Sequence, residues 1–195
     1  TIFPQYSFVY LPFLDETHSF PGIICIPPKM LCPIGNINVI LYNLPMLAEA
    51  IIQQYILYLF PIPDPHIEWL QTGYSLYLAD YISGKYLTHF FPMDRRWYDI
   101  NLLYEEDIHP SIVLDAIDPA TGHSYPDEYL KIKAKLLIHM ITQSIPNQDG
   151  FLLLMRQILK ENEDTSDFLT VNFYKDLQTF CPSIDFKIFK EQWLR

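Results

Sequence analysis

A proline-rich break between two apolar segments is the feature that most restricts the fold of this 195-residue chain. Residues 61–65 read Pro-Ile-Pro-Asp-Pro. Each proline lacks an amide donor and disfavours helical geometry at the residue before it, so no helix continues through this segment. The break therefore predicts two helices joined by an elbow, over residues 41–59 and 66–89. Asp64 as N-cap and Pro65 in the first helical position are favoured at the start of the second helix.

The first of these helices carries apolar residues at the three-and-four spacing of a packed face, which predicts that one side of it is buried. The residues on that side are Leu47, Ala50, Ile51, Tyr55 and Tyr58. The whole chain is 50% hydrophobic and 18% charged, which supplies enough apolar material for one sizeable core.

The charge balance argues against this chain as a main nucleic-acid contact. It carries 13 basic and 23 acidic residues, for a net charge of -10. The longest basic run is Arg95-Arg96. Duplex binding draws on clustered Lys and Arg to displace counterions from phosphates, and no such cluster is present in the sequence.

Cysteine and histidine usage favours neither a disulfide framework nor a zinc site. The three cysteines, Cys25, Cys32 and Cys181, form no CxxC pair, and an odd, sparse set suits a reducing compartment. The six histidines include no HxxxH pair. We expect no signal peptide, and no apolar run is long enough to span a bilayer. We expect the chain to be a segment of a larger protein.

The remaining sequence predicts a strand-rich start and a helical end. Proline-bounded, β-branched and aromatic runs at 6–11 and 22–26 predict short strands. Residues 93–104 predict a helix, and turn signals predict a connector over 105–127. Four more helices are expected, at 128–142, 150–160, 170–180 and 185–194.

The first of those four helices is amphipathic, and its faces can be assigned from the spacing. We expect a core-facing set, formed by Tyr129, Ile132, Leu136, Leu137 and Met140. We expect an outward-facing basic set, formed by Lys131, Lys133 and Lys135.

Two segments match the residue frame of a known metal-binding helix pair. Residues 49–55 read Glu-Ala-Ile-Ile-Gln-Gln-Tyr, and residues 69–74 read Trp-Leu-Gln-Thr-Gly-Tyr. They resemble the zinc helices of gluzincin aminopeptidases, where HExxH is followed by Gln-Trp and a second helix opens with Trp-Leu-Asn-Glu-Gly-Phe. The resemblance implies a thermolysin-like, α+β but mainly α fold, with a short N-terminal β part. On that division, 1–40 is the strand-rich edge of the domain, 41–145 its helical part and 146–195 its C-terminal helices.

The positions that bind zinc and activate water in that family hold other residues in this chain. Glu49 and Gln53 stand where the two histidine ligands are expected, Ala50 at the general base and Thr72 at the third ligand. Two histidines at i and i+4 bind zinc because one helical turn aligns their ring nitrogens. Glutamate and glutamine at that spacing offer at best a weak oxygen site. Without a base or a metal to acidify water, nothing at these positions activates a nucleophile. We expect no metal, no cofactor and no catalysis.

Two further family positions are altered. The start at 3–6, Phe-Pro-Gln-Tyr, resembles the family's Phe-Pro-Tyr lead-in, and 22–26 then takes the place of Gly-Ala-Met-Glu-Asn, the edge strand that grips the substrate. Cys25 replaces its glutamate, whose carboxylate pairs with the substrate ammonium. Aligning Lys133-Ala134 with the family's Lys-Gly puts Lys131 at its oxyanion-stabilising tyrosine. Ordinary strands unrelated to that motif remain an alternative for the first segment.

The segment 131–136, Lys-Ile-Lys-Ala-Lys-Leu, points to one family among the relatives of these aminopeptidases. It is similar to the TBP-associated factor two family, the aminopeptidase-like subunits of the general transcription factor TFIID. That resemblance implies a nuclear scaffold that helps to engage the initiator and docks against the largest TFIID subunit and the histone-fold subunit numbered eight. DNA contact is expected elsewhere in the protein, and the old substrate cleft, if open, would hold a peptide segment.

Two other interpretations remain open on the sequence alone. One is an active, divergent metallo-aminopeptidase that uses Glu49, Gln53 and a distant histidine. The other is a helical protein-interaction domain unrelated to peptidases. The geometry relating Glu49, Gln53 and Thr72 is what distinguishes them.

Overall fold

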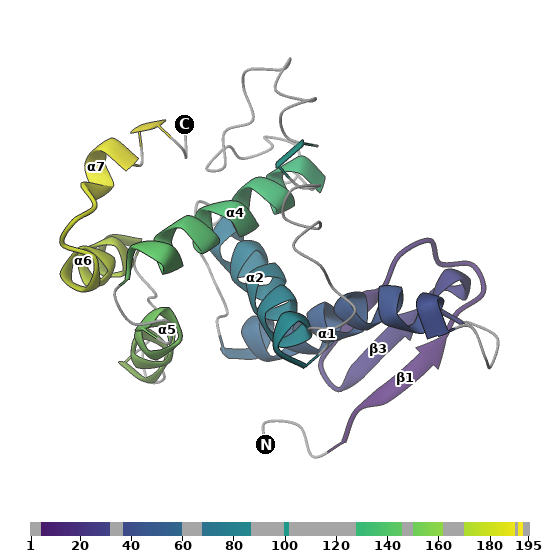
Figure 1. The fold of residues 1–195 in the computed structure, drawn as a ribbon. Coiled ribbons are helices and arrows are strands. Elements are labelled where there is room, and N and C mark those ends of the chain that lie inside the picture. Colours follow the sequence, from purple (N-terminus) through teal and green to yellow (C-terminus); the bar gives the residue numbers. More distant parts are fainter. Residues whose placement is uncertain are drawn as a thin grey trace, which may run out of the picture.

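The protein is mainly helical, with a small sheet close to the N-terminus, as the computed structural model shows (Figure 1). The structure describes residues 5–31, 37–59, 68–86, 100–101, 128–145, 150–161, 170–189 and 191–192. The predicted elbow at 61–65, the connector at 105–127 and most of the predicted helix at 93–104 lie outside these ranges. The sheet and α7 lie at opposite ends of the molecule (Figure 1).

Ten elements are defined within the described ranges. In chain order they are β1 (Ser7–Tyr10), β2 (His18–Phe20), β3 (Ile23–Ile26), the 3-10 turn η1 (Pro28–Met30), α1 (Ile37–Leu59), α2 (Glu68–Tyr86), α4 (Glu128–Ser144), α5 (Gly150–Glu161), α6 (Thr170–Phe180) and α7 (Phe186–Phe189).

The sheet has the order β1-β3-β2, so β3 is its central strand. β1 pairs with β3 in parallel, and β2 pairs with β3 antiparallel. The antiparallel pair is joined by Pro21 and Gly22, and Gly22 has φ 75°. A proline followed by a glycine at positive φ is the preferred pair for a type II turn. The sequence predicted β1 and β3 but missed β2, which has three residues, two of them polar.

Helix α1 confirms the predicted end at Leu59 and begins at Ile37 rather than at residue 41. It continues through Pro45, a residue that removes one intrahelical hydrogen bond. The early part of the helix is held by Asn43, a buried residue whose Nδ2 donates to the Met30 carbonyl at 3.2 Å. This bond ties α1 to η1 and satisfies an amide that would be costly to bury alone.

Helix α2 is sandwiched between α1 and α4, and the main core lies along it. The predicted start, at residue 66, lies just outside the described part, and α2 is described from Glu68. Its sequence brings Trp69, Leu70 and Tyr74 into the core, and all three are buried. Tyr74 meets Phe151 of α5 edge to face, with ring centroids 5.6 Å apart. Burial raises the pKa of the Tyr74 hydroxyl well above its usual value.

Gly73 of α2 lies in close contact with Ala134 of α4. A Cβ atom placed on Gly73 would lie 2.7 Å from both the carbonyl carbon and the carbonyl oxygen of Ala134. The two helices therefore meet backbone to backbone at this point, and glycine is required by space rather than by backbone torsion.

The core-facing side of α4 differs from the predicted one. Ile132 and Leu137 are buried as expected, but Met140 is 39% exposed and Lys135, expected to point outward, is buried. The buried apolar residues of α4 are Leu130, Ile132, Ala134, Leu137, Ile138 and Ile141. Among them, Ala134 is the residue that lies against Gly73 of α2.

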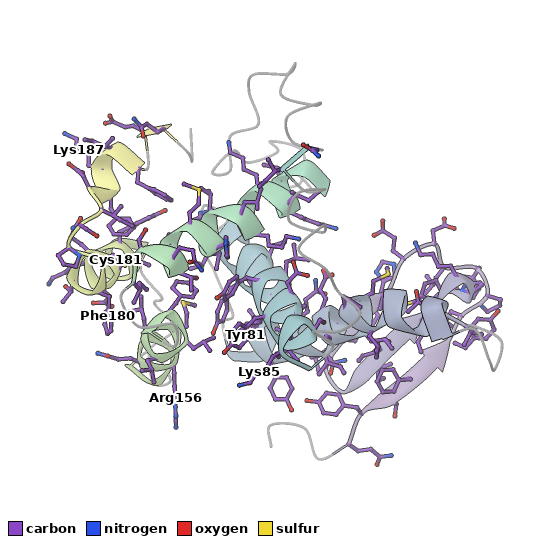
Figure 2. All side chains as sticks on the ribbon, in the orientation of Figure 1. Tyr81, Lys85, Arg156, Phe180, Cys181 and Lys187 are labelled. Carbon is purple, nitrogen blue, oxygen red and sulfur yellow. The ribbon has the colours of Figure 1, made fainter. Side chains whose placement is uncertain are left out.

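Lys135 is accommodated by an ion pair between α4 and α2. Its Nζ lies 2.9 Å from Asp80 Oδ2, and the side chains of Lys135 and Asp80 are 7% and 27% exposed. One helical turn further along, the Lys85 ammonium lies 5.9 Å from the Tyr81 ring centroid (Figure 2). The exposed end of α2 is therefore polar and aromatic, while its middle is packed.

The C-terminal helices largely follow the sequence prediction. Phe151, Leu154 and Met155 of α5 are buried, and α6 has the predicted bounds. Of the predicted helix at 185–194, residues 190, 193 and 194 lie outside the described part of the chain, and α7 is Phe186–Phe189. Cys181 lies between α6 and α7 and is fully buried (Figure 2). Burial raises the pKa of its thiol.

Candidate functional site

The positions that the sequence predicts to correspond to the zinc-binding turn of the aminopeptidases lie in the middle of α1. Glu49 and Gln53 are separated by one helical turn, and Gln53 Nε2 donates a hydrogen bond to Glu49 Oε1 at 3.0 Å. Both side chains are half-buried. The two groups that occupy the ligand positions thus bind one another, as an amide donor and a carboxylate acceptor at i and i+4 are able to do.

Ala50 stands between them, at the position of the general base, and is buried with 3% of its surface exposed. Its methyl group brings no proton acceptor. Its carbonyl oxygen accepts a hydrogen bond from Ser19 Oγ of β2 at 2.9 Å. The site of the expected base is therefore a packing contact between α1 and the sheet.

Thr72 and Lys131 are half-buried, on α2 and α4 respectively. The packing of α2 against both α1 and α4 brings the three helices together. Of these four predicted positions, the structure joins Glu49 and Gln53 by a hydrogen bond.

The described part of the chain contains no group of three His, Cys, Asp or Glu side chains arranged to hold a metal ion. None of its helices has the length and apolar character needed to cross a membrane.

The assignment of residues 22–26 to an edge strand is wrong. β3 is the central strand, with β1 on one side and β2 on the other, so its backbone has no free edge for a peptide. Cys25 lies in register with Val9 of β1 and His18 of β2, and it is buried. The antiparallel edge strand is β2. The Pro21-Gly22 pair that follows β2 is a hairpin signal, and it forms the turn into β3.

Gln54, which follows the second ligand position, has a role that the sequence did not reveal. It is 2% exposed, and its side-chain amide both accepts a hydrogen bond from the β2–β3 turn and donates one to it. Its Oε1 accepts from the Gly22 amide at 3.3 Å, and its Nε2 donates to the Ile23 carbonyl at 3.0 Å. Together with the bond from Ser19 to the Ala50 carbonyl, this amide fastens the hairpin to α1.

Replacement of this amide tests its role. We expect Gln54→Ala to lower the free energy of unfolding by about 2 kcal/mol, because two backbone groups of the turn lose buried partners. Urea unfolding followed by circular dichroism measures the change. The matched control is Gln53→Ala, one residue away and half-buried, for which a change of about 0.5 kcal/mol or less is expected. Equal losses in the two variants would contradict the anchoring role of Gln54.

Comparison of the chain with protein-family models, with curated proteins and with solved structures gives no match.

Proposed function

We propose that this chain is part of a non-catalytic scaffold subunit of TFIID, built on the fold of a gluzincin aminopeptidase that has lost its zinc site. The observation that carries the proposal is the hydrogen bond between Gln53 and Glu49 across the buried Ala50. A glutamine amide and a carboxylate satisfy one another where two metal-binding imidazoles and a base would be needed. The activity of a peptidase has no chemical basis at these positions.

The division between kept and replaced residues supports the fold part of the proposal. The residues that match the family frame have packing roles: Trp69 and Leu70 are buried, Gly73 allows α2 to approach α4, and Gln54 fastens the hairpin. The residues that differ, Glu49, Ala50, Gln53 and Thr72, are those that would carry chemistry. Such a division is expected when a fold is retained for binding and its catalysis is lost.

The proposed partners are the other TFIID subunits, in the nucleus, with promoter DNA engaged through the complex. The net charge of -10 supports protein contacts in preference to direct DNA contact by this segment. The proposed role is to assist initiator recognition and assembly of the RNA polymerase II pre-initiation complex.

Co-purification tests this function. We expect the tagged full-length protein, purified from its own cells at moderate salt, to bring TBP and other TFIID subunits with it, as identified by mass spectrometry. A matched purification of an unrelated tagged nuclear protein controls for carry-over. A preparation in which TFIID subunits are no more abundant than in this control would overturn the scaffold proposal.

A grafted metal site tests the fold without reference to partners. In the variant Glu49→His/Gln53→His, two imidazoles one turn apart should bind zinc weakly. Adding Thr72→Glu should tighten zinc binding by about tenfold or more, because the fold proposed here points position 72 at the same metal. Competition with a chromophoric chelator gives the zinc affinity of each variant.

The control for this graft is Gln71→Glu in place of Thr72→Glu. It adds the same carboxylate one residue away, so its direction differs by about 100° around the helix. We expect it to leave the affinity of the double-histidine variant unchanged. If the carboxylates at 71 and 72 have equal effects, position 72 does not converge with 49 and 53, and the chain is a helical domain of another kind.

A further inference from the structure

We draw no further inference here: the strongest candidate, the outer edge of β1 with the adjoining sheet face on which Val9, Phe20 and Ile23 are exposed, is an apolar surface for which nothing in the described residues shows what covers it.

Discussion

Gly73→Ala should lower the free energy of unfolding by about 2 kcal/mol, although alanine is the better helix former. The added methyl group would lie 2.7 Å from the Ala134 carbonyl carbon and oxygen, which are backbone atoms of α4. To relieve the overlap, α2 and α4 would have to move apart. Overpacking of this kind lowers the free energy of unfolding by about 3 kcal/mol at the upper end of its usual range. The helix propensity of alanine offsets about 1 kcal/mol of that cost. Urea unfolding with circular dichroism at 222 nm measures the net effect.

Gly84, on the same helix, provides the matched control. A Cβ atom at Gly84 meets nothing within 4 Å. Gly84→Ala should therefore stabilise the protein by up to about 1 kcal/mol through helix propensity alone. Adding Ala134→Gly to Gly73→Ala should restore little stability, because the backbone overlap remains when the Ala134 methyl group is removed. A stable Gly73→Ala variant would show that the two helices do not approach this closely.

Asp80→Ala should lower the free energy of unfolding by about 3 kcal/mol, near the lower end of the range for breaking a buried ion pair. The Lys135 side chain is only 7% exposed, so its ammonium loses the Asp80 carboxylate in a place that water scarcely reaches. The partial exposure of Asp80, at 27%, keeps the effect from being larger. Chemical unfolding at pH 7 and low salt measures the loss.

Two companion variants separate the lost ion pair from the lost side-chain volume. Asp80→Leu/Lys135→Met removes both charges and keeps most of the volume, so it should recover most of the stability that Asp80→Ala loses. Lys131→Ala, a half-buried lysine on the same helix, should change stability by about 0.5 kcal/mol or less. If the double replacement is as unstable as Asp80→Ala, the charge of Lys135 is not the cause of the loss.

Helix positions could be predicted from the sequence because their signals are local. The C-terminal ends of α1 and α6 follow from proline breaks and from the three-and-four spacing of apolar residues. The short β2 strand gave no such signal, since three residues of mixed polarity show no alternation. It forms because the Pro21-Gly22 turn returns the chain alongside β3 and because Ser19 finds the Ala50 carbonyl.

The face of α4 could not be predicted because it depends on a different helix. Apolar spacing alone allows several overlapping faces, including the one that contains Met140. The choice among them is made by Gly73, which admits only a small residue opposite it, and by Asp80, which makes a buried Lys135 acceptable. Neither effect is visible within residues 128–144.

The geometry of the candidate site could be predicted only in part. Glu49 and Gln53 could be predicted to be neighbours, because one turn of helix separates them. The placement of Cys25 could not, because strand order is decided by pairing between segments rather than by the strand's own residues.

The fastening of the hairpin to α1 has a consequence for how the chain can be divided. The hydrogen bonds of Ser19 and Gln54 join segments that are about thirty residues apart in the sequence. Gln54 belongs to α1, whereas its partners, Gly22 and Ile23, belong to the hairpin. Removing residues 5–31 would take away both backbone partners of the Gln54 amide and uncover the part of α1 on which the hairpin packs. The sheet and α1 therefore form one cooperative folding unit, and any shortened version of the protein has to keep or discard them together.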